Sequence, residues 1–191
     1  CTKCLFQYLP FANSLNVKDY DTCIKNINVN IPITRANSGN NSSELSLQYD
    51  QFKDDGFKCT HLNVRSLYRN IDEIRMFLHE NDIHILALNA TLLDDSISDN
   101  ELRTQDYDII RKDRNRNGGY VAIYIRSSIC CELIHSDVLD PLEVILIKVR
   151  PKPSTPFLFM SWYRPPDSKI EIMNQYEKAL AFADTFRLSI I

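Results

Sequence analysis

Residues 57–191 alternate between short apolar runs and amphipathic stretches, which restricts this part of the chain to a layered arrangement of strands and helices. Residues 57–64 alternate in polarity and predict a strand, and residues 83–88 form an apolar run typical of a strand covered on both faces. Between them, four apolar residues recur at spacings of four, three and four, the period of one helical face. These residues are Leu67, Ile71, Ile74 and Leu78.

Five later segments are rich in β-branched and aromatic residues and predict further strands. They are residues 107–111, 119–125, 129–134, 142–149 and 157–163. An apolar stripe predicts a helix over residues 169–186, and residues 188–191 predict the start of another strand. A βαβ beginning followed by consecutive strands predicts an α/β (α+β) fold, in which packed sheets are flanked by helices.

The first 56 residues differ from the rest of the chain. Residues 13–56 include a tract rich in serine and asparagine, Thr34–Gln51, that has no apolar periodicity. Such a tract cannot bury enough apolar surface to offset the conformational entropy lost on folding. We therefore expect residues 13–56 to be a mobile linker and residues 57–191 to be the folded domain.

Composition limits the possible partners and surroundings. A net charge of −3 argues against a strongly basic protein that wraps nucleic acid, but it leaves a local basic patch open. No apolar run reaches the roughly 20 residues of a membrane span, and no secretory signal is visible, so no membrane partner is expected. Six cysteines without a disulfide-scaffold pattern favour a reduced, intracellular protein, in the nucleus or the cytoplasm. The oligomeric state stays open.

Four short motifs follow one another in the expected folded domain. They are residues 61–67 (HLNVRSL), 87–95 (ALNATLLDD), 118–125 (GGYVAIYI) and 162–168 (WYRPPDS). In this order they resemble the endonuclease domain of non-LTR (LINE-type) retrotransposons, a branch of the exonuclease–endonuclease–phosphatase superfamily. The resemblance implies a four-layer αββα sandwich. This chain would hold an incomplete copy, the amino-terminal part, because it ends about where the family places a Gly-Asp-x-Asn motif.

The resemblance also implies a chemistry, the magnesium-dependent hydrolysis that nicks target DNA to prime reverse transcription. Asn63 matches an active-site asparagine of the family, and Tyr163 matches a tyrosine whose hydroxyl lies near the scissile phosphate. Ala90 stands where the family has a metal-binding glutamate. A methyl group cannot bind a cation, so we expect this copy to bind no magnesium and to be catalytically inactive.

Each of these residues also has a purely structural interpretation. Asn63 could cap the following helix, since asparagine is favoured there, and Tyr163 could pack its ring in the core. Asp94 and Asp95 could replace the missing carboxylate, but a pair of acids on a loop is more often solvated.

A basic cluster between residues 103 and 126 contains six basic and three acidic residues, in a chain that is acidic overall. Lysine and arginine side chains bind phosphate and make such binding strongly dependent on salt. The candidate contacts to DNA, the family's partner, are Arg111, Lys112, Arg114, Arg116 and Arg164. A solvated hairpin face is the structural alternative. A non-catalytic module that binds nucleic acid or protein is therefore the second functional hypothesis, and a chain with exposed strand edges that does not fold stably is the third.

The spacing Cys1-x-x-Cys4, with Leu9-Pro10-Phe11 after it, resembles the tail of a PHD-like zinc finger that often precedes this endonuclease. Residues 1–12 would then be a remnant of that finger. A structural zinc site needs four ligands, so Cys1 and Cys4 alone should not hold zinc firmly. The four histidines show no ligand spacing, and we expect them to be structural or surface residues. Because the chain begins with Cys1 rather than methionine, we expect it to be part of a longer reading frame.

Overall fold

The computed structural model describes residues 27–28, 56–113, 120–165 and 168–191. The expected zinc-finger remnant lies outside these residues, as does almost all of the expected linker. Within the described residues, no helix is both long and apolar enough to cross a bilayer.

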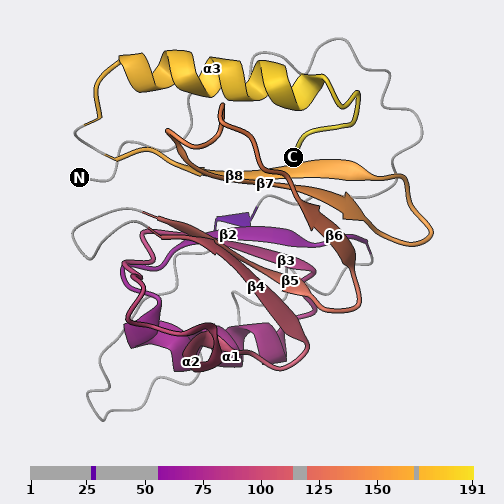
Figure 1. Cartoon of the computed structure of the whole chain (residues 1–191). Helices are drawn as coiled ribbons and strands as arrows, with labels where there is room; N and C mark the ends of the chain where they lie inside the picture. The colour runs from indigo at the N-terminus through magenta and orange to yellow at the C-terminus, as the bar shows by residue number, and fades with distance from the viewer. Residues whose placement is uncertain (1–26, 29–55, 114–119, 166–167) are drawn as a thin grey trace.

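Two sheets lie face to face, and helices cover their outer faces, so that four layers follow in the order helix, sheet, sheet, helix (Figure 1). The first sheet has the strand order β1 (Ile27–Asn28), β2 (Cys59–Asn63), β3 (Ile85–Asn89), β5 (Val121–Arg126) and β4 (Tyr107–Lys112). The second sheet has the order β6 (Cys130–Leu133), β7 (Glu143–Arg150) and β8 (Phe157–Tyr163). The helices are α1 (Ile71–Glu80), α2 (Asp99–Leu102) and α3 (Glu171–Asp184). The expected mixed fold with an αββα layer order is confirmed.

The strands run in the directions that a βαβ beginning requires. β2 and β3 are parallel and are joined through α1, whereas β5 is antiparallel to both β3 and β4. β6, β7 and β8 form an antiparallel meander. Two consequences follow for the position of a site. The carboxyl ends of β2 and β3 lie side by side, and the carboxyl end of β8 lies beside the start of β7.

Three differences from the sequence expectations concern element ends and short elements. Helix α1 begins at Ile71, because a short 3-10 turn, Tyr68–Asn70, precedes it. Helix α2 has four residues, too few to show a helical period, although the Ser98 and Glu101 side chains that cap it form a recognisable S-x-x-E signal. The expected strand at residues 188–191 forms only a bridge between Leu158 and Ile190.

The short strand β1 falls within the expected linker. Its two residues instead pair in parallel with β2, as Ile27 with Thr60 and Asn28 with His61. Without this pairing, β2 would expose the unpaired backbone groups of a sheet edge.

An apolar layer between the two sheets holds them together. It is called the inter-sheet layer here, and its buried members are Cys59, Ile85, Ala87, Val121, Ile123, Ile125, Ile145, Ile147, Val149 and Phe159. The alternate residues of β3 and β5 face the other way and pack beneath α1, which explains why these strands are apolar throughout. A third cluster joins β7 and β8 to α3.

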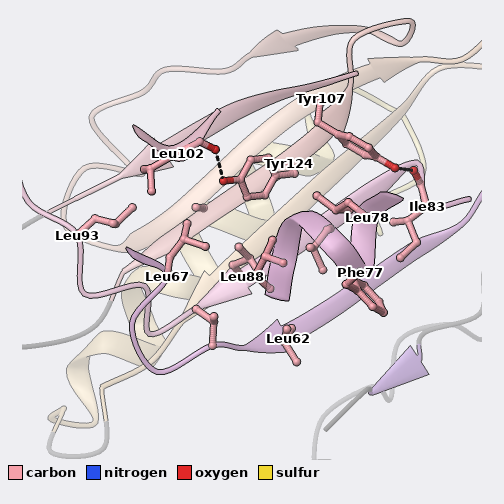
Figure 2. Packing of buried hydrophobic residues seen from close by; sticks show 14 residues of the cluster. Leu62, Leu67, Phe77, Leu78, Ile83, Leu88, Leu93, Leu102, Tyr107 and Tyr124 are labelled. Atoms are coloured by element: carbon pink, nitrogen blue, oxygen red, sulfur yellow. Dashed lines mark hydrogen bonds between the residues drawn. The ribbon is translucent and has the colours of Figure 1, made fainter. Parts of the chain in front are cut away.

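Two buried tyrosine hydroxyls tie the ends of strands and helices to the core beneath the first sheet. Figure 2 shows Tyr107 donating to the Ile83 carbonyl and Tyr124 donating to the Leu102 carbonyl, each at 2.6 Å. Burial raises the pKa of Tyr124 to about 12. The bond from Tyr124 satisfies a buried carbonyl at the end of α2 and thereby fixes the segment that follows β3.

We expect Tyr124→Phe to lower the free energy of unfolding by about 1 kcal/mol, because it removes the shorter of the two hydrogen bonds to the buried Leu102 carbonyl and leaves only that from the Thr104 hydroxyl at 3.5 Å. Urea unfolding followed by circular dichroism measures the change. Tyr176→Phe is the matched control, since within the described residues the Tyr176 ring stacks on Trp162 and its hydroxyl makes no hydrogen bond. The control should change stability by less than about 0.5 kcal/mol, and equal losses in both variants would contradict the assignment.

Candidate functional site

Polar side chains gather where strands of both sheets end. Asn63 and Asn89 are the last residues of the parallel strands β2 and β3, and they are partners in the strand register. Asn63 is exposed and Asn89 is half-buried. Each asparagine directly follows a leucine whose side chain packs on the α1 side of the sheet. Since successive side chains of a strand point to opposite faces, both asparagines lie on the side that faces β7 and β8.

Asn89 connects the two sheets. Its side-chain amide donates to the backbone carbonyl of Trp162 on β8 at 3.3 Å. The next residue along β8 is Tyr163, which is the register partner of Glu143 at the start of β7. Asn63, Asn89, Tyr163 and Glu143 are therefore grouped at one edge of the sandwich, and they are called the strand-end site below. The structure thus places Asn63 and Tyr163, the two residues that the family resemblance singled out, at the same edge of the sandwich.

Ala90 follows β3 at this same edge. Its backbone is left-handed, with φ of 55°, a conformation that costs a non-glycine residue about 1–2 kcal/mol. The Ala90 carbonyl accepts a backbone hydrogen bond from Ser66 at 2.9 Å, which extends the contact between β2 and β3 beyond the strands. The alanine methyl group therefore lies beside the strand-end site at a fixed position and offers no ligand atom.

Glu143 supplies the carboxylate of the site and is already engaged. It is buried, and its Oε2 accepts the backbone N–H of Tyr120 at 2.7 Å. Burial raises the pKa of Tyr163, and the negative charge of Glu143 raises it further, so this phenol stays protonated at neutral pH. Glu143 was not identified from the sequence, although an acid at the start of the apolar run 142–149 is a visible signal.

His61 is a second residue that the sequence analysis missed at this site. It lies on β2 two residues before Asn63, so both side chains point to the same face of the sheet. Burial lowers the pKa of His61, and the neighbouring Asn89 side chain partly offsets this effect. Asn89 Oδ1 is itself buried and has no partner in hydrogen-bond geometry. A neutral imidazole therefore borders the strand-end site.

Asp94 and Asp95, the acids closest to Ala90 in sequence, belong to a different cluster. Asp94 accepts hydrogen bonds from the backbone N–H and hydroxyl of Ser96, as in an ordinary loop turn. Burial raises the pKa of Asp113, and although Arg111 partly offsets this, the charges of Asp95 and Asp94 raise it further. The two aspartates thus lie close enough to Asp113, the residue that follows edge strand β4, for their charges to act on it.

The donors at the strand-end site do not fit a hard divalent cation. Magnesium is held by carboxylates in near-octahedral oxygen geometry, often together with substrate phosphates. Here the donors are two amides, a protonated phenol and one carboxylate that is bonded to a backbone N–H. Throughout the part of the chain that the structure describes, no three histidine, cysteine or acidic side chains are arranged to hold a metal ion.

Two of the expected DNA contacts have their cationic groups bonded inside the protein. The Arg111 guanidinium forms ion pairs with Asp99 at 3.0 Å and Asp113 at 3.1 Å, and it donates to the Ile97 carbonyl at 2.7 Å. The Lys112 ammonium donates to the Leu139 carbonyl at 2.9 Å, and burial lowers its pKa. Contact with phosphate would require these bonds to break.

Of the remaining residues that the sequence analysis proposed as DNA contacts or zinc ligands, the structure describes one. Arg164 is exposed next to Tyr163, and its Nε donates to the Ser168 hydroxyl at 3.1 Å. The residues that lie outside the described part of the chain are Arg114, Arg116, Cys1 and Cys4.

No known family model and no curated protein matches the sequence. The solved structures that are similar to this chain include two endonucleases. One is the endonuclease domain of TRAS1, a telomere-specific non-LTR retrotransposon, with a TM-score of 0.43 and 13% identity over 63% of this chain and 51% of that chain. The other is an AP endonuclease from Archaeoglobus fulgidus, with a TM-score of 0.40 and 17% identity over 64% of this chain and 46% of that chain. This chain therefore spans about half the length of each.

Half-buried, neutral histidines predict that the free energy of unfolding falls in mild acid. His61 and His84 both have a pKa below the ordinary value of 6.5, chiefly because of burial. Below that pH the unfolded chain binds more protons than the folded one, so the free energy of unfolding decreases as the pH falls below about 6.5. Urea unfolding of the wild type and of His61→Gln at about pH 7.5 and about pH 5.5 measures this effect. The variant should lose less stability on acidification, and an equal loss in both proteins would contradict the assignment.

Proposed function

We propose that this domain is a catalytically inactive form of the metal-dependent endonuclease of non-LTR retrotransposons. The observation that carries the proposal is the place of Ala90. It follows β3 at the edge where Asn63, Asn89 and Tyr163 meet, which is the position that the sequence resemblance assigns to a metal-binding glutamate. The site keeps its polar frame and lacks its main charged ligand.

The chemistry of phosphodiester cleavage explains why this loss matters. A bound cation positions the phosphate, activates water and neutralises the charge that develops at phosphorus. Asparagine side chains can orient a phosphate or a water, but as neutral groups they do not hold a doubly charged ion firmly. Glu143 Oε2 could bind a cation only by giving up the hydrogen bond that it accepts from the buried Tyr120 N–H.

The first test is activity with the metal that the family uses. Purified protein should leave supercoiled plasmid intact in the presence of magnesium or manganese, because nothing at the strand-end site holds the cation. Metal-dependent nicking by the purified protein would overturn the proposal, provided that a preparation made in parallel from an Asn63→Ala variant does not nick.

A second test restores the missing charge and reads metal binding directly. Ala90→Glu should make Mn²⁺ broaden the NMR signals of Asn63 and Asn89, with an affinity in the roughly millimolar range. Ala90→Gln is the matched control, because it adds the same length without the charge. Selective broadening of these two signals by Mn²⁺ in the wild type would contradict the proposal.

A non-catalytic nucleic-acid module is the second candidate, and the observation that favours it is the exposed Arg164 beside Tyr163. Arg114 and Arg116 are further candidates from the sequence alone, while the internal bonds of Arg111 and Lys112 leave them unsuited to phosphate contact.

Duplex DNA titrations at about 50 mM and about 200 mM salt test this candidate. Binding should weaken steeply with salt and should be abolished when Arg114 and Arg116 are both changed to glutamine. The Arg187→Gln control, beyond α3, should bind as the wild type does. Absence of binding at low salt, or binding that the double variant retains, would exclude this candidate.

A further inference from the structure

A cavity of about 550 Å³ lies between the segment that follows β2 and the segment that follows β3. Its size falls within the range of small-ligand sites. Backbone hydrogen bonds from Ser66 to Ala90 and from Leu67 to Thr91, at 2.9 and 2.7 Å, join the two segments. Three lining residues, Arg65, Ser66 and Leu92, have left-handed backbones. The hydrogen bonds hold the two segments together at left-handed Ser66 and its neighbour, so the wall that they form does not depend on a ligand.

The cavity carries two unpaired positive charges. Arg65 and Arg69 both line it and are exposed, and neither guanidinium has an ion-pair or hydrogen-bond partner among the described residues. Glu101 is the acid in the lining, and its carboxylate already accepts the backbone N–H and hydroxyl of Ser98 at 2.8 and 3.0 Å. The two arginines are therefore available to an anion from solvent. Guanidinium groups bind phosphate and carboxylate through paired N–H donors.

The other side chains of the lining suit a planar, weakly polar ligand group. Tyr68 is 47% exposed, and its hydroxyl lies near the Glu101 carboxylate. Leu92 and Ile97 line the same cavity and are half-buried. An exposed aromatic ring beside aliphatic side chains binds planar groups by stacking, as in the binding of nucleic-acid bases.

We propose that this cavity binds a nucleotide, with the phosphate between Arg65 and Arg69 and the base against Tyr68. The proposed site is separate from the strand-end site and requires no metal ion, so it does not depend on the proposed loss of catalysis. A simple inorganic anion would use the arginines without the ring, and an uncharged nucleoside would use the ring without the arginines. The combination of charges and aromatic surface favours a ligand that has both parts.

Isothermal titration with AMP, adenosine and inorganic phosphate tests the assignment on the full chain. AMP should bind saturably and more tightly than adenosine or phosphate alone. Arg65→Gln and Arg69→Gln should each weaken AMP binding by about tenfold, the loss expected for a charge-assisted hydrogen bond to phosphate. Tyr68→Leu should weaken AMP binding but leave the binding of inorganic phosphate unchanged. Arg187→Gln is the matched control, because it removes an equally exposed arginine outside the cavity lining.

Loss of binding can be distinguished from loss of folding, because the substituted side chains are exposed and circular dichroism can show that the variants fold. No saturable AMP binding up to about 10 mM would overturn the proposal. It would also be overturned if both arginine variants bound AMP as the wild type does, or if phosphate or adenosine alone bound as tightly as AMP. These results say nothing of plasmid nicking, so failure here is distinguishable from failure of the proposed function.

A further titration identifies the source of the nucleotide. A single-stranded oligonucleotide with a 5′ phosphate carries the same chemical group as AMP. Tighter binding of the oligonucleotide, again lost in Arg65→Gln and Arg69→Gln, would show that the site holds a nucleotide of a strand. Equal or weaker binding of the oligonucleotide would show that the site holds a free mononucleotide. Both results support a nucleotide site, whereas oligonucleotide binding that is insensitive to both variants would count against it.

Discussion

The contact between the two sheets determines where any site in this domain can form. Aliphatic residues such as Ile85, Ile123 and Ile147 fill the inter-sheet layer and exclude water from it. At one edge the layer changes from apolar to polar, and the Asn89 amide bonds the Trp162 carbonyl across the gap between the sheets. Packing therefore brings the ends of β2, β3 and β8 together and leaves a half-buried polar group at the edge of the core.

The distribution of charge around this edge differs from what hydrolysis of a phosphodiester requires. Asp99 and Asp113 pair with Arg111, while the strand-end site has one carboxylate, that of Glu143, which already accepts a backbone hydrogen bond. The adjacent cavity is lined by Arg65 and Arg69, whose guanidinium groups have no acidic partner among the residues that the structure describes. A domain with this arrangement is better suited to holding an anion beside the strand ends than to holding a divalent cation among them.

Most of the fold follows from patterns visible in the sequence, and the details of the site do not. Apolar periodicity locates the strands and the two longer helices, because burial on one or both faces imposes a period on the chain. It cannot show that Glu143 accepts the Tyr120 N–H, or that the Arg111 side chain turns inward, since these contacts join residues far apart in sequence. His61 was overlooked for a related reason. A lone histidine carries no ligand spacing, and only the strand geometry places it beside Asn89.

Anomalous scattering from crystals soaked in manganese tests the central claim most directly, because it locates the ion without requiring turnover. The electrostatics of the strand-end site predict no anomalous peak within bonding distance of Asn63, Asn89 or Glu143. A well-occupied peak there, coordinated by side chains of this chain, would contradict the claim that Ala90 has removed the capacity to bind a cation.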